Sequence, residues 1–194
     1  MLIAIEGIDG SGKTTQVGLL TKALRALNYD VVDSKEPTDG QYGSQLRESA
    51  FTGRKTAEEE LELFILDRKE HVETLIKPTI DRKGIVILDR YYFSTIAYQS
   101  ARGLDPKIIQ SQNEAFAPAP DVLFILDLSA EESLLRIGIR DGQGNDFEDR
   151  ENLEKCRAIF NTMEAPYIHT IDASESSANI HESILNIVLN KLNQ

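Results

Sequence analysis

The segment at positions 7–14 reads GIDGSGKT, which has the residue types and the spacing needed to hold phosphate groups. Its glycines let backbone N–H groups wrap around phosphate oxygens, and a helix that begins after it adds a favourable dipole. The segment follows an apolar run and matches G-x-x-x-x-G-K-[ST] in full, so we interpret it as a P-loop rather than a flexible turn. The residues expected to bind ATP are Gly7, Ile8, Asp9, Gly10, Ser11, Gly12, Lys13, Thr14 and Thr15.

A second polar set follows the apolar run 85–88, which ends in Asp89, Arg90 and Tyr91. An aspartate at a strand end beside a P-loop holds magnesium, directly or through water, together with the P-loop hydroxyl of Thr14. A solvated charge pair is the alternative interpretation, but the abrupt change from an apolar strand to this triplet favours a functional one. We therefore expect Thr14 and Asp89 to bind Mg²⁺ and Lys13 and Arg90 to be catalytic.

Two further groups of side chains could form a nucleobase pocket. Phe64 and Arg68 are four residues apart in an expected helix, so both can face one cavity. An aromatic ring for stacking and a guanidinium for a carbonyl oxygen suit a base, although core packing would explain Phe64 equally well. A polar and aromatic stripe on the helix after Arg90 contains Ser94, Thr95, Tyr98, Gln99 and Arg102.

The segment KEPTDG at 35–40 and Arg47 beyond it follow the second expected strand. Taken alone, this pattern is typical of a turn followed by a surface arginine. Its position at a strand end nevertheless places it next to the P-loop in a parallel sheet.

A glycine-rich polar segment at about 138–148 is a candidate lid that closes over ATP, although it could be only a connector. Arg136 and Arg140 flank it at helical spacing and are its candidate catalytic arginines. Arg140 is the favoured one, because Arg136 lies deeper in its helix and could pair with acids such as Glu132.

The elements that must position these residues alternate along the chain. Apolar runs predict strands at 2–5, 31–32 with neighbours, 85–88, 122–128 and 167–171, and helical patterns occupy 14–28, 42–53, 57–77, 91–101, 105–116, 130–140, 149–164 and 178–192. This alternation predicts an α/β, P-loop NTPase-type three-layer fold with a central, mostly parallel five-stranded sheet. With no repeat or linker, residues 1–194 are expected to form a single domain.

The amino-acid composition limits the classes of binding partner and the location that we expect for this protein. The net charge of −11 argues against a nucleic-acid polymer, which favours a basic face. No apolar run has the length of a membrane span or a signal peptide, so we expect a cytoplasmic protein. The lone Cys156 excludes an internal disulfide and is expected to be a thiol packed against a helix.

Together these segments resemble the thymidylate kinase family over most of the chain. The resemblance rests on GIDGSGKTTQ, KEPTDG with Arg47 at the matching distance, FILDR, DRYYFSTIAYQ, APAPD and LDL, in the family's order. It implies an ATP-dependent nucleoside monophosphate kinase that uses Mg²⁺ and phosphorylates a deoxynucleoside monophosphate, first of all dTMP. It also implies a homodimer.

The resemblance assigns roles in binding the acceptor. Asp9 would contact the deoxyribose 3′-hydroxyl, and Tyr98 would lie against the sugar, where a 2′-hydroxyl would crowd it. Phe64 would stack on the base, and Arg68 and Gln99 would hydrogen-bond it. The implied acceptor set also includes Glu36, Arg47 and Arg90 around the phosphate, and Thr95.

One position indicates a subgroup of the family, and three others depart from the family pattern. Gly10 stands where one subgroup has an arginine, so the resemblance is to the subgroup with a catalytic arginine in the lid. Lys35 replaces an arginine, TDG at 38–40 replaces a glycine-rich continuation, and the segment that begins Asn145-Asp146 lacks the arginine common there.

Two other function classes remain open at this stage. A deoxynucleoside kinase would use an acid such as Glu36 as general base for a neutral hydroxyl, whereas an anionic monophosphate needs cationic clamps such as Arg47 and Arg90. A kinase for another deoxynucleoside monophosphate is the nearest variant. A P-loop switch without a small acceptor would leave the residues of the base pocket without a role.

Overall fold

The computed structural model describes residues 1–141 and 146–193, apart from the side chains of 50, 51, 139–141 and 146–149. Within these residues a single sheet has the strand order β2-β3-β1-β4-β5, and all of its pairings are parallel. The predicted five-stranded α/β fold is confirmed, and the sheet is fully rather than mostly parallel. The strands are β1 (Leu2–Glu6), β2 (Val31–Lys35), β3 (Ile85–Asp89), β4 (Val122–Asp127) and β5 (Ile168–Asp172).

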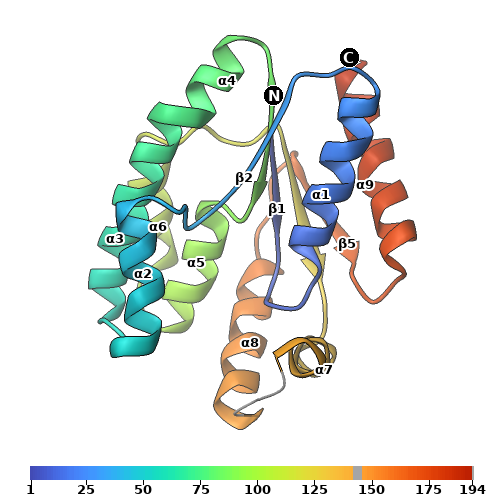
Figure 1. The fold of residues 1–194 in the computed structure, drawn as a ribbon. Coiled ribbons are helices and arrows are strands. Elements are labelled where there is room, and N and C mark those ends of the chain that lie inside the picture. The colour runs from blue at the N-terminus through green and yellow to red at the C-terminus, as the bar shows by residue number, and fades with distance from the viewer. Residues whose placement is uncertain (142–145, 194) are drawn as a thin grey trace.

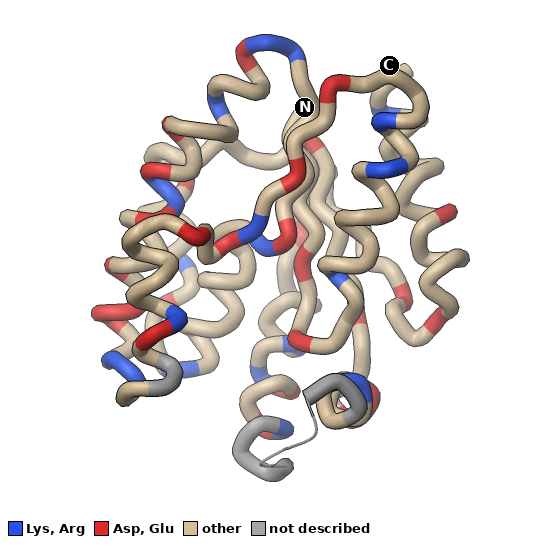
Figure 2. Tube along the Cα trace, viewed as in Figure 1, with Lys and Arg blue, Asp and Glu red and all other residues tan. Residues whose placement is uncertain are grey.

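Helices cover both faces of the sheet, which gives the three expected layers (Figure 1). Helices α1 (Lys13–Ala26) and α9 (Ser177–Leu192) pack on one face. The other helices are α2 (Gln41–Thr52), α3 (Ala57–His71), α4 (Lys77–Asp81), α5 (Tyr92–Ala101), α6 (Pro106–Glu114), α7 (Ala130–Asp141) and α8 (Asp146–Phe160). Lys and Arg are interspersed with Asp and Glu on helices on both sides of the sheet (Figure 2).

The core lies on both faces of the sheet because buried parallel strands contribute side chains in both directions. In β1, Leu2 and Ala4 join a cluster with α5 and α8, whereas Ile3 and Ile5 join a cluster with α1 and α9. Cys156 on α8 is fully buried in the first cluster, as expected for a packing thiol. None of the described helices combines the length and the apolar character needed to cross a bilayer.

The single long helix expected at 57–77 is interrupted. A capping box formed by Thr56 and Glu59 starts α3, which ends at His71 and continues as a π-helical turn, Val72–Ile76, into α4. The backbone N–H of Lys77 donates to the carbonyl of Val72, five residues back. Pro78 has no N–H with which to continue the α-helical ladder, which favours an irregular turn before it.

The register of the sheet places the functional strand ends together. Ile5 pairs with both Asp89 and Phe124, so the carboxyl ends of β1, β3 and β4 lie at one edge. The P-loop leaves β1 at this edge, and ligands of such sheets bind there.

Candidate active site

The P-loop is held in place by close contacts that require glycine. Gly7 and Gly10 have φ angles of 138° and 75°. A Cβ on Gly7 would lie 2.6 Å from the carbonyl oxygen of Leu126, and one on Gly10 would lie 2.8 Å from that of Ser133. The Ser133 hydroxyl also donates to the Asp9 carbonyl at 2.5 Å. Helix α7 therefore packs directly on the P-loop and leaves no room for an arginine at position 10.

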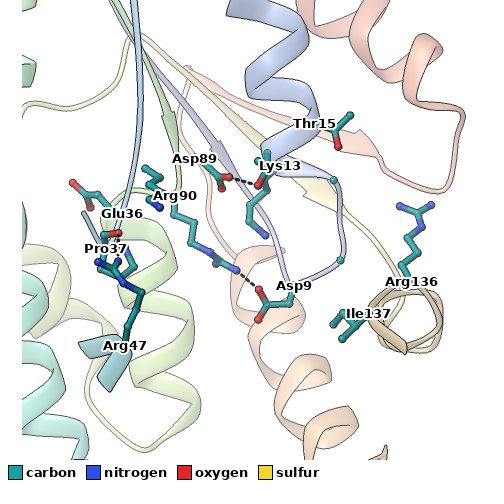
Figure 3. Close-up of a pocket in the computed structure, with 14 residues that line it drawn as sticks. Asp9, Lys13, Thr15, Glu36, Pro37, Arg47, Asp89, Arg90, Arg136 and Ile137 are labelled. Carbon is teal, nitrogen blue, oxygen red and sulfur yellow. Dashed lines mark hydrogen bonds and ion pairs between the residues drawn. The ribbon is translucent and has the colours of Figure 1, made fainter. Parts of the chain in front are cut away.

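The P-loop lysine points into a cleft of about 610 Å³ at the edge of the sheet (Figure 3). Lys13 donates from Nζ to the Ile8 carbonyl at 2.8 Å and is only 6 % exposed. Burial and the nearby charge of Arg90 lower its pKa to about 7, although the charges of the surrounding carboxylates oppose this shift. An incoming phosphate would supply the negative charge that this ammonium lacks.

The two residues expected to bind magnesium are in direct contact. The Thr14 hydroxyl donates to Asp89 Oδ2, and both residues line the same cleft as Lys13. Among the described residues, no group of three or more His, Cys, Asp and Glu is placed to hold a metal ion. Two oxygen ligands that leave the remaining positions to water and phosphates match what Mg²⁺ prefers.

Arg90 is fixed by a network that starts on β1. Arg90 has a φ of 70°, an uncommon conformation for a side chain of this size. Glu6, fully buried, accepts from the backbone N–H groups of Tyr91 at 2.7 Å and Ser94 at 3.1 Å, and from the Ser94 hydroxyl at 2.5 Å. The same hydroxyl accepts from Arg90 at 2.8 Å. Burial raises the pKa of Glu6 to about 7, although these hydrogen bonds and the charge of Arg90 oppose the rise.

Asp9 and Tyr98 form the other side of this network. Arg90 donates to Asp9 Oδ1 at 2.5 Å, and the Tyr98 hydroxyl donates to Oδ2 at 3.1 Å. Burial alone would raise the pKa of Asp9, but the charges of Arg90 and Lys13 outweigh it and hold the pKa below its usual value. The carboxylate is therefore ionised, and its side chain is about half exposed toward the cleft.

A smaller pocket of about 260 Å³ adjoins the first and contains the residues expected to hold a base. Arg68, 1 % exposed, donates to Glu36 at 2.7 Å, to Asn113 at 2.5 Å and to Thr95 at 3.0 Å. The guanidinium is thus oriented by the residue that follows β2 and by partners from α5 and α6. The predicted members that line this pocket are Asp9, Glu36, Phe64, Arg68, Arg90, Thr95, Tyr98 and Gln99.

The loop after β2 is tied down by a residue that the sequence did not single out. Asp67 accepts from the backbone N–H and the hydroxyl of Thr38, and from the N–H of Gly43. These bonds fix the start of α2 and place Arg47 at the cleft, where it donates to the Pro37 carbonyl at 3.1 Å and pairs with Asp39. The segment 35–40 is therefore part of the site and not only a surface turn.

The structure brings together most of the expected phosphate-binding residues, but not all. Gly10, Gly12, Lys13, Thr14, Thr15, Arg47 and Arg136 line the larger cleft, whereas Gly7, Ile8 and Ser11 do not. Arg136 donates to the Ala173 carbonyl at 2.9 Å, while Glu132 bonds with Ser129, so the expected pair of Arg136 with Glu132 is not found. The Arg140 side chain and positions 142–145 of the candidate lid lie outside the described residues.

Several residues of the site were missed by sequence reasoning. Glu6 and Glu60 had detectable signals, because one is a charge inside an otherwise apolar strand and the other lies four residues before Phe64 on the same helix face. His71, which bonds Glu36 at 3.0 Å, and Asn113 gave no local signal.

Comparisons with known proteins identify the family of this chain. Residues 5–184 match the thymidylate kinase family. The chain belongs to the thymidylate kinase family. It is 53 % identical over 180 residues to the thymidylate kinase of Xanthomonas euvesicatoria pv. vesicatoria, covering 93 % of this chain and 79 % of the relative. It is 49 % identical over 172 residues to that of Akkermansia muciniphila, covering 89 % and 83 %.

Membership of this family carries the activity: the chain is an ATP-dependent kinase that phosphorylates dTMP to dTDP. The fold and the reaction expected from the sequence are thereby confirmed. The alternatives of a deoxynucleoside kinase and of a switch protein are not supported.

Proposed function

We propose that this kinase binds ATP and Mg²⁺ in the larger cleft and dTMP in the smaller pocket, with the transferred group passing Arg90 where the two cavities meet. The observation that carries this arrangement is the shared wall: Asp9, Glu36, Pro37 and Arg90 line both cavities. An acceptor phosphate placed at this wall faces a donor phosphate held by the P-loop. In-line transfer requires this geometry.

Charge neutralisation rather than proton transfer drives the proposed reaction. The acceptor oxygen of dTMP is already anionic, so the site needs cations that stabilise the charge spread over the moving phosphoryl group. Lys13 would hold the donor phosphates, and Arg90 would bridge donor and acceptor. Arg47, at the same cleft, would hold the acceptor phosphate.

Thr14 and Asp89 would hold the magnesium ion, which would neutralise part of the charge on the ATP phosphates. Their fit to this ion rests on the contact between the hydroxyl and the carboxylate at the floor of the cleft. Asp89 also accepts the hydrogen bond of the Thr14 hydroxyl, so a lone pair of the hydroxyl oxygen stays available for a cation.

The base and the sugar would be recognised in the smaller pocket. Phe64 supplies an aromatic face, and Arg68 and Gln99 supply polar groups at the same wall. Tyr98 and Asp9 would hold the deoxyribose: Asp9 accepts from Arg90, the proposed bridge between the phosphates, and the Tyr98 hydroxyl donates to Asp9. Arg140 as the lid arginine, a single domain over 1–194, a homodimer and a cytoplasmic location stay predictions.

The direct test is coupled ADP release with dTMP, dUMP, dAMP, dGMP and thymidine as acceptors, with MgCl₂ varied at fixed ATP. We expect turnover with dTMP, slower turnover with dUMP, and loss of turnover when EDTA removes the divalent cation. A kcat/KM for dAMP or dGMP equal to that for dTMP would contradict the proposed base pocket. Turnover independent of divalent cations would contradict the role of Thr14 and Asp89.

A further inference from the structure

Glu60 is a buried carboxylate at the wall of the smaller pocket that phosphoryl transfer does not use. It lies on α3 and is 6 % exposed. Oε1 accepts from Arg54 at 3.1 Å, and Oε2 accepts from Gln99 Nε2 at 3.1 Å and from Arg102. One carboxylate therefore contacts three side chains, which come from the loop before α3, from α5 and from the residue that follows α5.

The amide of Gln99 lies between opposite charges. Its Nε2 donates to Glu60, and its Oε1 accepts from Arg102 Nη1 at 3.4 Å. Rotation of the amide by half a turn would place its oxygen against the carboxylate and its NH₂ group against the guanidinium. Gln99 is 1 % exposed, so water cannot screen either repulsion. Glu60 and Arg102 thus allow one orientation of an amide that is otherwise free to flip.

The fixed orientation of the Gln99 amide matters because pyrimidine bases differ in the hydrogen-bonding groups at N3 and C4, which an amide can contact. Thymine and uracil carry an N–H donor at N3, whereas cytosine has an acceptor at N3 and an amino group at C4. A freely rotating glutamine can satisfy both patterns by exchanging its oxygen and nitrogen. A glutamine held in one orientation satisfies one pattern and leaves buried groups unpaired with the other, which gives strong discrimination.

We propose that Glu60 is a positioning residue for base choice: by holding the Gln99 amide with Arg102, it makes the pocket select an imide base over cytosine. This inference rests on the proposed placement of the base in the smaller pocket. It assigns to Glu60 no contact with the reacting atoms.

A purely structural role for the same carboxylate makes a different prediction. Arg102 also donates to the Lys55 carbonyl at 2.7 Å, so the cluster ties the loop before α3 to α5. If this were its only role, weakening it would lower activity with every acceptor in parallel. A role in amide orientation changes the ratio between acceptors.

The test is kcat/KM for dTMP, dUMP and dCMP with the wild type, Glu60→Gln and Glu62→Gln. Glu62 is exposed on the same helix and serves as the matched control. In Glu60→Gln the neutral partner accepts either orientation of Gln99. We expect the preference for dTMP over dCMP to fall by about tenfold or more, mainly through the acceptor KM, with the KM for ATP changed less than about twofold. Glu62→Gln should keep the wild-type ratio.

Arg102→Met provides a second variant in case Glu60→Gln folds poorly, because it removes the guanidinium that holds the amide oxygen. It should lower the same ratio. Unchanged ratios in a folded variant, or an equal loss with all three acceptors, would overturn the inference. A wild-type enzyme that uses dTMP but does not prefer it to dCMP would overturn it too, whereas a wild type inactive on dTMP would instead contradict the proposed function.

Discussion

The two ends of the binding cleft treat their charges in opposite ways. At the phosphate end, the Lys13 ammonium contacts the carbonyl oxygen of Ile8, and the Asp9 side chain is about half exposed. At the base end, the ion pair between Glu36 and Arg68 is 3 % and 1 % exposed, and both residues have further polar partners. The phosphate end keeps charge available for a ligand, whereas at the base end the two buried charges neutralise each other.

This difference indicates that the charges at the phosphate end serve binding and catalysis, whereas those at the base end fix the shape of the pocket. A buried cation without a full countercharge is destabilising in the free protein, and the lowered pKa of Lys13 is the sign of that cost. The cost is recovered when phosphates bind, so it favours the complex. A buried ion pair with satisfied hydrogen bonds contributes little to binding a charge, but it fixes the walls of a pocket.

Removing the P-loop ammonium should separate activity from stability most strongly. We expect Lys13→Ala to lower kcat by about 10³-fold or more, because the charge that stabilises the transferred phosphoryl group is lost. The free energy of unfolding should stay equal or rise, since a charge disfavoured by burial is removed. Steady-state kinetics and urea unfolding measure the two effects, and Lys22→Ala, exposed on the same helix, is the control. A clear loss of stability in Lys13→Ala would mean that this end is not under strain.

The same kind of substitution at the two ends should have opposite consequences. Glu36→Gln leaves the Arg68 guanidinium buried without a countercharge, so we expect a loss of about 3–5 kcal/mol in the free energy of unfolding. Asp9→Asn removes a half-exposed carboxylate and should cost less than about 1 kcal/mol. In kinetics the order should reverse, with Asp9→Asn affecting the dTMP KM at unchanged ATP affinity. Equal stability losses in the two variants would remove the distinction between the ends.

The pH dependence of stability should reveal the carboxylate beneath Arg90. In the folded protein the pKa of Glu6 is about 7, whereas in the unfolded chain it has the usual glutamate pKa of 4.5. Its contribution to stability is therefore fully present below about pH 4.5 and is lost as pH rises to about 7. Arg90 and Lys13 face this group, and Lys13 titrates near the upper end of the window.

Glu6→Gln should remove this slope, so the difference in unfolding free energy between wild type and variant should change by up to about 3 kcal/mol between pH 4.5 and 7. Urea unfolding at several pH values measures it. A constant difference across the range would show that Glu6 is ionised throughout. Ser94→Ala keeps the carboxyl group but removes a hydrogen bond that opposes the raised pKa, so it should keep or steepen the slope.

The local sequence explains how the phosphate end is built more fully than how the base end is built, for a physical reason. Gly7, Lys13, Thr14 and Asp89 follow directly from the local pattern of strand, loop and helix, because one strand end and one helix start build most of that site. The base end is assembled from β2, α3, α5 and α6, so its charge pairs depend on tertiary packing. The residues next to Asn113 and His71 in the sequence do not indicate that these two side chains orient Arg68 and Glu36.

The interruption of the long helix shows the same limit in the fold. The spacing of apolar residues predicted one helix over 57–77, and Pro78 lay just beyond that range. A proline directly after a predicted helix indicates that the helix ends or bends, but it does not indicate a π-helical turn. The choice depends on the packing of Val72 and Ile76 against the sheet, which no local pattern contains.

Tyr98 lies where the two ends meet, and the smallest effect is expected there. Its hydroxyl donates to Asp9 and accepts from the Asp9 N–H at 3.2 Å, while its ring lies 5.1 Å from the Arg90 guanidinium carbon. Tyr98→Phe removes the polar contacts but keeps the ring, so the contact with Arg90 and the steric barrier to a 2′-hydroxyl should persist. We expect the preference for dTMP over its ribonucleotide to stay within about threefold of wild type, with the dTMP KM raised a few fold by the weaker hold on Asp9. Tyr98→Ala, which removes the ring, should lose the preference. If Tyr98→Phe alone abolished sugar selection, the hydroxyl network of the phosphate end, and not the shape of the base end, would be what excludes ribose.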